Sequence, residues 1–376
     1  MNATIADRMR TTNNRATGFD YLRLVLSSGV ILWHTVMTSY GPAAQLLLPS
    51  WVRALEFAIL LMFFMLSGFL VAGSLERCQT LWQFAGLRIL RIVPALSMEV
   101  FLSALLLGPL FTTIALRDYF SDPMFSSYFL NIVGDIHFYL PGMFPDNPTP
   151  AMVNMQLWTI PYELYCYIGL ILVAALGLVK RRQWLLIAAS VLQVAFIVRG
   201  WNSSYAPQQI ALSGNLLVLM FFWGVIFYEY RERIPYDRFL GISALVLMLA
   251  LLSTQSLRNV AAIPAAYLTI YLGLQNPPRS RIVLSGDYSY GLYLYGFPLQ
   301  QAVASFGPSV HHWYFNFLIA YPLALLCAVF SWWVLEKRAL ALRRFIDPKF
   351  WQQRSVAGHR SAGIAGSGVE IAKGEL

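Results

Sequence analysis

The sequence predicts an all-α integral membrane protein, a bundle of about ten transmembrane helices with both termini on the cytoplasmic side. Of its 376 residues, 58% are hydrophobic and only 12% are charged. Charged residues make up about a quarter of an ordinary soluble domain, so this composition excludes one. Ten apolar stretches are long enough, or nearly so, to cross a bilayer. They are residues 21–38, 52–74, 92–114, 157–179, 183–199, 209–228, 239–255, 259–274, 287–306 and 314–335.

The distribution of basic residues predicts the orientation of these stretches. The net charge is +9, and the basic residues concentrate in the N-terminal arm, the C-terminal segment and alternate connections. The intervening connections contain only Arg53, Arg117, Arg199 and Arg258. Because Lys and Arg favour the cytoplasmic side of a membrane, both termini are predicted to be cytoplasmic. The basic excess is therefore a signal of topology and not of nucleic-acid binding.

The chain is predicted to contain one polytopic membrane domain, residues 1–349. The segment after Arg354 is small and polar, and residues 350–376 are predicted to form a disordered cytoplasmic tail. The longest connection, about 115–156, is placed outside by the charge pattern, and a loop of this length is usually functional or contains short helices such as Tyr128–Val133. The cysteines are scattered, so neither a disulfide framework nor a metal site is predicted.

A polar stripe runs along the first apolar segment. Asp20, Arg23, Ser27 and His34 fall within an arc of roughly 60° on one helix face. Arg23 and His34 are separated by about three turns, or ~16 Å. Ionisable groups inside a membrane helix are costly and usually indicate a functional site. His34, which can exchange protons near neutral pH, is the first candidate catalytic residue. The alternative is a histidine that only packs against a neighbouring helix.

Glu163 in the fourth apolar segment is the second candidate. Its predicted depth is similar to that of His34, so we expect its carboxylate to orient the imidazole, as the acid does in a hydrolase triad. A buried structural ion pair is the alternative for Glu163. Trp158 and Tyr162 lie beside it in the sequence, and they fit either a substrate site or an interfacial aromatic belt.

Arg88 and Arg91 form the third candidate. They are three residues apart, so they share one helix face near the predicted cytoplasmic end of the third segment. The guanidinium fork matches phosphate oxygens, and such a pair is suited to a phosphate-containing ligand. The alternative is that the two arginines only anchor the helix on the cytoplasmic side.

These segments, in this order, resemble the acyltransferase 3 family of integral membrane acyltransferases, which includes bacterial O-antigen and exopolysaccharide O-acetylases. The matching segments are FDYLRLVLSSGVILWH, FFMLSGFL, LRILRIVPAL, NMQLWTIPYELYCYIGL and SYGLYLYGFPLQQ. SWWVLEKR is similar to the closing segment of the family. One departure concerns the ninth segment, where many members have Trp-His and this chain has Tyr295-Gly296. A second histidine is therefore absent at that place.

The resemblance implies a membrane-bound O-acyltransferase, multi-pass in the bacterial inner membrane. It would transfer an acyl group, most commonly acetyl from acetyl-CoA, to a hydroxyl of an envelope or extracellular carbohydrate. No metal is expected. His34 would be the catalytic histidine, here a general base, acting with Arg23 and Glu163. Arg23, Arg88 and Arg91 would engage the acyl-CoA. The residues expected to bind substrate are Asp20, Asn154, Trp158, Tyr162 and Tyr290.

Two other interpretations of the same residues are open at this stage. His34 itself can become acylated, which is a covalent route available to histidine. The chain can also be a flippase or transporter of a glycolipid or anionic solute, because polar stripes line transport paths. Against transport, we find neither an inverted repeat nor paired broken helices.

Overall fold

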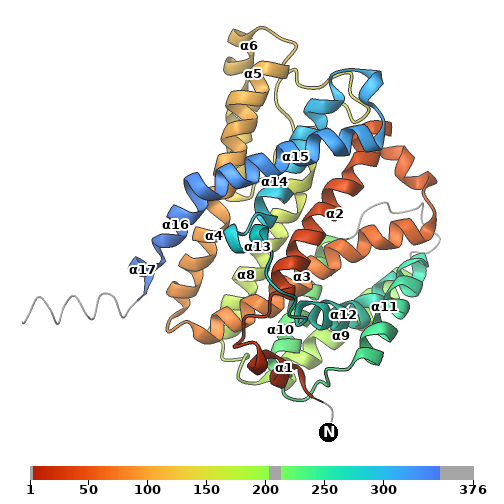
Figure 1. Cartoon of the computed structure of the whole chain (residues 1–376), viewed down its shortest axis with the longest axis vertical. Coiled ribbons are helices and arrows are strands. Elements are labelled where there is room, and N and C mark those ends of the chain that lie inside the picture. Colours follow the sequence, from red (N-terminus) through yellow and green to blue (C-terminus); the bar gives the residue numbers. More distant parts are fainter. Residues whose placement is uncertain (1–2, 203–212, 348–376) are drawn as a thin grey trace, which may run out of the picture.

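The computed structural model describes residues 3–202 and 213–347, and this part of the chain is helical throughout, with three isolated β-bridges and no named strand (Figure 1). The predicted all-α class is confirmed. The predicted tail 350–376 and the first residues of the segment 209–228 lie outside the described residues.

Each of the ten predicted apolar segments overlaps one of the longer helices, and the segment 92–114 continues beyond α4 through two shorter elements. The helices are α2 (Gly18–Tyr40), α3 (Ser50–Arg77), α4 (Leu81–Leu102), α8 (Ile160–Ala175), α9 (Arg182–Asn202), α10 (Gly214–Glu229), α11 (Arg238–Leu252), α12 (Ala262–Gly273), α14 (Ser289–Ala304) and α15 (Trp313–Ser331). Within the described residues, five helical stretches are long and apolar enough to cross a membrane: Ser50–Arg77, Leu81–Phe111, Met155–Ala175, Arg182–Arg199 and Trp313–Ile346. The chain is thus a membrane protein, and the count of about ten crossings stays a prediction.

Shorter elements connect these helices or extend them. They are α1 (Ile5–Thr11), η1 (Pro42–Leu47), η2 (Ser103–Leu107), α5 (Gly108–Phe111), α6 (Leu116–Ser121), α7 (Pro123–Tyr128), η3 (Phe129–Val133), η4 (Met155–Thr159), η5 (Gln255–Ala261), α13 (Arg281–Ser285), η6 (Pro308–Val310), η7 (Trp332–Glu336), α16 (Lys337–Ala341) and α17 (Arg343–Ile346). Two of them, η2 and η7, are π-helices that continue α4 and α15. Glu336 is the last residue of η7, and Glu99 of α4 accepts a hydrogen bond from Ser103, the first residue of η2; both glutamates are buried. Turns of π-helix occur frequently at functional sites.

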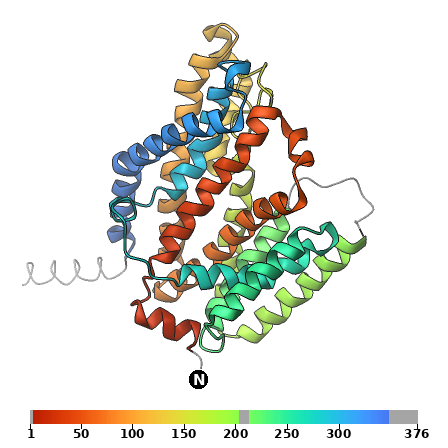
Figure 2. The same cartoon turned by 45° about the vertical axis from the view of Figure 1, so that its right-hand side comes forward.

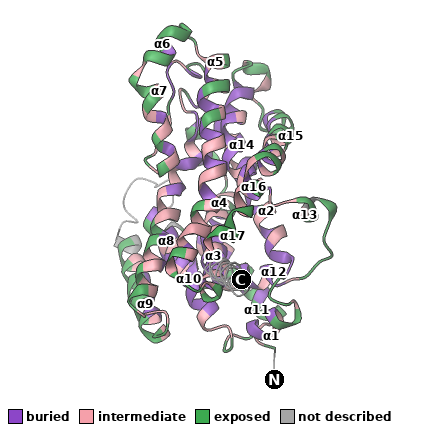
Figure 3. Ribbon diagram, turned by 90° about the vertical axis from the view of Figure 1, so that its left-hand side faces the viewer, coloured by how far each residue is buried: buried purple, intermediate pink, exposed green. Residues whose placement is uncertain are grey.

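The helices differ in how much of their surface is covered by protein. Helix α14 packs between α2 and α15, while α9 to α12 gather at the end where α1 lies (Figure 2). Figure 3 shows α14 as mostly buried, whereas α9 is largely intermediate or exposed. The exposed side chains of α9 include Val191 and Leu192. An exposed apolar face of this kind is stable against lipid, which agrees with a membrane environment.

Glycines set the closest helix crossing, between α3 and α10. A Cβ added to Gly68 would meet the backbone oxygen of Phe221, and one added to Gly224 would meet the backbone of Met65 and Phe69. Small residues allow membrane helices to approach this closely. The crossing brings the residues of α3 that line the site described below into a rigid position.

We expect Gly68→Ala to destabilise the protein by about 1–3 kcal/mol, because the added methyl group must separate two backbones. The measurement is the denaturant-dependent unfolding of the purified protein in detergent. Gly169→Ala is the matched control, since its added carbon would meet only the ring of Phe222 at 3.1 Å. Equal stability of the two variants would contradict the predicted role of the glycine crossing.

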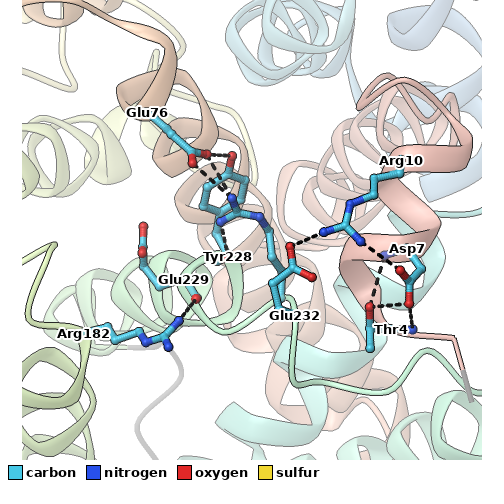
Figure 4. A network of polar contacts seen from close by, with 9 residues as sticks. Thr4, Asp7, Arg10, Glu76, Arg182, Tyr228, Glu229 and Glu232 are labelled. Atoms are coloured by element: carbon cyan, nitrogen blue, oxygen red, sulfur yellow. Dashed lines mark hydrogen bonds and ion pairs between the residues drawn. The ribbon is translucent and has the colours of Figure 1, made fainter. Parts of the chain in front are cut away.

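Helix α1 is held at one end of the bundle by backbone and charged contacts. The amides of Ile5 and Ala6 donate to the oxygens of Ile234 and Arg231, both at 3.0 Å. Arg10 forms ion pairs with Asp7 at 3.0 Å and Glu232 at 2.6 Å (Figure 4). The backbone amide and the hydroxyl of Thr4 hold the pKa of Asp7 below its usual value.

A second part of this network joins α3 to the turn after α10. The guanidinium of Arg231 lies 3.1 Å from the carboxylate of Glu76, and the Tyr228 hydroxyl donates to the same carboxylate (Figure 4). Exposed pairs of this kind contribute only about 0–1 kcal/mol each. Their effect is mainly to position the ends of α1, α3 and α10.

The long connection 115–156 is ordered and covers the opposite end of the bundle. It contains α6, α7 and η3, which confirms the predicted short helix at Tyr128–Val133. Its later residues dock on helix ends: Thr149 donates to the Met37 oxygen at 2.7 Å, and Asn147 donates to the Gln301 oxygen at 2.8 Å. This docking delivers the residues that follow, through η4, into the centre of the bundle.

Candidate active site

Two neighbouring cavities lie inside the bundle. The first, called here the arginine cavity, has a volume of about 170 Å³, and its polar lining includes Arg23, Arg88, Arg91, Glu163 and Tyr290. The second, called the histidine cavity, has a volume of about 90 Å³, and its polar lining includes Trp33, His34, Glu56, Gln156 and Trp158. Leu60 and Tyr293 line both cavities, so these two side chains form the partition between them.

Asp287 holds two of the three arginines. Its carboxylate lies 3.0 Å from Arg23 and 2.8 Å from Arg91. Arg23 also pairs with Asp20 at 2.6 Å, and Arg91 lies 3.8 Å from Glu336. The charges of Arg23 and Arg91 are therefore largely compensated within the protein.

Arg88 differs from the other two arginines. Its guanidinium donates to the Ser74 hydroxyl at 3.1 Å and lies over the rings of Phe84 and Tyr167. In residues 3–202 and 213–347, no carboxylate lies within ion-pair distance of it. Arg88 is thus the cation whose charge is most available to an anionic ligand.

Several donor groups of the arginine cavity lack a partner. The Nε atoms of Arg23 and Arg88 and the hydroxyl of Tyr290 are buried without a hydrogen bond to the described residues. Buried polar groups are normally satisfied, so unpaired donors on one cavity need an explanation. A ligand with several acceptor oxygens, such as a phosphate, would satisfy them.

Glu163 lies in the arginine cavity and not beside His34. It accepts a hydrogen bond from Tyr167 at 2.5 Å, and its charge interacts with those of Arg88 and Arg91. Within the described residues, no hydrogen bond joins it to the imidazole, and it does not line the histidine cavity. The expected contact with His34 is therefore corrected. A count of residues gives only the depth of Glu163, whereas the packing of α8 decides that its side chain lies with Arg88 and Arg91 of α4.

His34 presents its ring to the histidine cavity. The ring packs edge-on against the ring of Phe297, with 5.2 Å between the two centroids, and His34 as a whole is half-buried. In the described part of the chain the imidazole forms no hydrogen bond; only the backbone oxygen of His34 accepts one, from Thr38 at 3.0 Å. The ring nitrogens are consequently available to a substrate, which favours the functional interpretation over simple helix packing.

Glu56 of α3 is the carboxylate that shares the cavity with His34. Arg53 and Arg258 lie close enough to interact with its charge. Glu56 was not predicted from the sequence, although a signal is present there: it is the single acidic residue in the apolar stretch 52–74. An acid in a membrane segment is a functional candidate for the same reason as His34.

The remaining predicted substrate residues are divided between three environments. Tyr290 lines the arginine cavity, under the guanidinium of Arg91 at 5.5 Å, and Trp158 lines the histidine cavity. Asp20 pairs with Arg23 outside both cavities. Tyr162 packs on Trp158 and Tyr165, and Asn154 is fully buried beside Glu99. Asp20, Tyr162 and Asn154 therefore do not line either cavity.

The structure is that of an all-helical membrane protein with a cation-lined cavity beside a histidine-lined cavity. The acyltransferase domain of the acyltransferase 3 family matches residues 17–337, so the chain belongs to this family and is an acyltransferase. The predicted resemblance is confirmed.

Two curated relatives cover most of the chain. An "O-acetyl transferase" of Shigella phage Sf6 is 25% identical over 341 residues, which is 87% of this chain and 97% of that protein. "Nodulation protein 10" of Rhizobium leguminosarum bv. viciae is 27% identical over 369 residues, 89% of this chain and 97% of that protein. No solved structure matches the chain significantly.

Proposed function

We propose that this acyltransferase moves an acyl group, most commonly acetyl from acetyl-CoA, to a hydroxyl of an envelope or extracellular carbohydrate at the bacterial inner membrane. The observation that carries the proposal is the adjacency of the two cavities, which share Leu60 and Tyr293. The phage relative, which is called an O-acetyl transferase, supports acetyl as the acyl group and oxygen as the acceptor atom.

The arginine cavity is the proposed site of the donor. Arg88, which has no carboxylate within ion-pair distance among the described residues, supplies a charge for a phosphate of acyl-CoA, and Arg23, Arg91 and the Tyr290 hydroxyl complete the binding surface. With both termini cytoplasmic and residues 1–349 as one membrane domain, this cavity faces the compartment in which CoA is made. The acyl end of the donor then passes Leu60 and Tyr293 toward His34, ~16 Å further along α2.

The histidine cavity is the proposed site of transfer. His34 accepts the proton of the acceptor hydroxyl while the hydroxyl oxygen attacks the thioester carbonyl carbon. The carbon–sulfur bond breaks, and the leaving thiolate takes the proton from the imidazolium, so CoA departs as the free thiol. The products are an oxygen ester and CoA.

The two acids have separate proposed roles. Glu56, in the same cavity as His34, stabilises the imidazolium that forms during transfer. Glu163 remains a candidate catalytic residue on the donor side. It accepts a hydrogen bond from Tyr167, and its negative charge interacts with the positive charges of Arg88 and Arg91. Trp158 offers an aromatic face to a sugar in the histidine cavity.

The test of this function is mass spectrometry of envelope carbohydrates from cells with wild-type protein, with no protein, or with His34→Ala. An acyl increment that appears only with the wild-type protein supports the proposal, and its mass identifies the acyl group. Purified protein should also release CoA from acetyl-CoA. Movement of a glycolipid across vesicles without CoA release would instead establish transport.

Substitution of the two acids should separate their roles. We expect Glu56→Gln to lower kcat by about tenfold or more, since proton transfer at His34 loses electrostatic support. Glu163→Gln should mainly raise the KM for acetyl-CoA, because it acts at the arginine cavity. The measurement is steady-state CoA release at varied donor concentration. The opposite pattern, in which Glu163→Gln lowers kcat and leaves the KM unchanged, would instead indicate that Glu163 acts on His34.

A further inference from the structure

Gln156 is a buried amide in the wall of the histidine cavity. Its side chain is only 1% exposed, and its Oε1 atom has no hydrogen-bond partner among the described residues. Its Nε2 atom donates to the Leu294 oxygen at 2.6 Å and to Asn154 Oδ1 at 3.2 Å. An unpaired buried acceptor on a cavity wall is costly unless a ligand supplies a donor.

The orientation of this amide is set by a chain of buried groups that begins at Glu99. The Glu99 Oε1 atom accepts hydrogen bonds from Ser103 at 2.5 Å and from Asn154 Nδ2 at 2.7 Å. A carboxylate accepts and an amide nitrogen donates, so Asn154 must turn its NH₂ group toward Glu99. Its Oδ1 atom then faces Gln156, which in turn must present its NH₂ group to Asn154 and its oxygen to the cavity.

Burial makes this order of donors and acceptors hard to reverse. Glu99 and Asn154 are 0% exposed, and the Tyr128 hydroxyl contacts Asn154 Nδ2 as well. Each reversed amide would place two acceptors against each other away from water, and an unsatisfied buried group costs about 1–3 kcal/mol. Two acceptors therefore fix the Gln156 amide: the Leu294 oxygen directly, and Glu99 through Asn154, and together they leave the Gln156 oxygen for the cavity.

The number of protons on the attacking hydroxyl then identifies what the Gln156 Oε1 atom binds. The hydroxyl that attacks the thioester has one proton, which goes to His34 in the proposed function. Gln156 Oε1 therefore needs an O–H from another group of the same acceptor molecule. An unpaired oxygen acceptor in the wall of the cavity is the complement of a hydroxyl proton.

We propose that Gln156 binds a second hydroxyl of the acceptor, on a carbon next to the one that is acylated, and that Glu99 is the positioning residue for Gln156 through Asn154. This inference rests on the proposed function and narrows its acceptor to compounds with neighbouring hydroxyls, as in a sugar ring. An alcohol with one isolated hydroxyl would leave the Gln156 oxygen unpaired.

The first test measures, for Gln156→Met, the rate at which envelope carbohydrates gain the acyl increment. Methionine keeps the size and removes the acceptor, so we expect a loss of roughly 10- to 100-fold. Gln300→Met is the matched control, because Gln300 is also buried with an unpartnered Oε1 but lines neither cavity. Thermal unfolding of each purified variant shows whether it is folded.

The second test is a double-mutant cycle for Glu99. Glu99→Gln lets Asn154 reverse, so Gln156 loses one of the two acceptors that fix its amide while the Leu294 oxygen remains, and the rate should fall several-fold when residue 156 is glutamine. In the Gln156→Met background it should have almost no effect, because methionine has no amide to orient. Equal losses in both backgrounds would show that Glu99 is only structural and would overturn its positioning role.

The position of the new ester provides a readout that does not depend on any variant folding. NMR of the wild-type product should find a free hydroxyl on the carbon next to the acylated one. An ester whose adjacent carbons carry no free hydroxyl, or full activity of Gln156→Met, would overturn the inference while the proposed function stands. An acyl increment that is absent in wild-type cells or unchanged in His34→Ala would instead overturn the proposed function, and the inference with it.

Discussion

Replacement of His34 by alanine is expected to lower acyl transfer by about 10²–10⁴-fold, which is the usual contribution of a general base. The chain should still fold, because the imidazole makes no hydrogen bond within the described residues and packs on Phe297 at 5.2 Å. The measurement is the initial rate of CoA release by purified protein with an excess of acceptor, together with the acyl increment of envelope carbohydrates.

His312→Ala is the matched control for this experiment. His312 is exposed in the segment before α15, where its ring stacks on Tyr314 at 5.4 Å, so its loss should leave the rate unchanged. A His34→Ala variant with the wild-type rate would refute the assignment of His34. An acyl-protein trapped without acceptor, and absent in His34→Ala, would show that the histidine acts as a nucleophile.

Replacement of Arg88 by alanine is expected to raise the KM for acetyl-CoA by roughly 10- to 100-fold, because a hydrogen bond to a charged group contributes about 1.5–3 kcal/mol. The value of kcat should change less, since Arg88 lines the arginine cavity and not the histidine cavity. The measurement is CoA release at varied donor concentration, with direct binding of acetyl-CoA as a second readout.

Two further variants separate donor binding from simple anchoring of the helix. Arg88→Lys keeps the positive charge but loses the planar fork, so it should recover only part of the donor affinity. Arg77→Ala removes an exposed basic residue that lines neither cavity, and it should leave the KM unchanged. If lysine restores the wild-type KM completely, charge alone is sufficient and the specific phosphate contact is wrong.

The helices and the individual charged residues could be predicted from the sequence because both depend on local patterns. Apolar runs of membrane length predicted every helix that carries the site. Helical periodicity also predicted that Asp20 and Arg23 share a face, and the structure joins them at 2.6 Å. The same reasoning identified His34, Arg88 and Arg91 as unusual, and all three line a cavity.

The direction in which a buried side chain points was predicted less well than the helix that carries it. Glu163 was expected beside His34, but it lies with the arginines in the arginine cavity. Glu56 of α3 lines the histidine cavity together with His34 of α2, an arrangement that no local pattern encodes. Asn154 was predicted to bind substrate, yet its amide bonds Glu99, and Gln156 two residues later reaches the cavity.

The sequence by itself determined that this protein is a helical membrane acyltransferase with a histidine and three arginines as its candidate functional groups. Those conclusions rest on composition, on helical periodicity and on the order of short motifs, which are properties of neighbouring residues. Only the tertiary structure decided which arginine keeps a free charge, because Asp287 reaches Arg23 and Arg91 from a distant helix start. It also decided which acid faces His34 and which way the Gln156 amide points. These depend on how helices far apart in the chain pack, and close packing at contacts such as Gly68 against Phe221 is set by shape complementarity over the whole bundle.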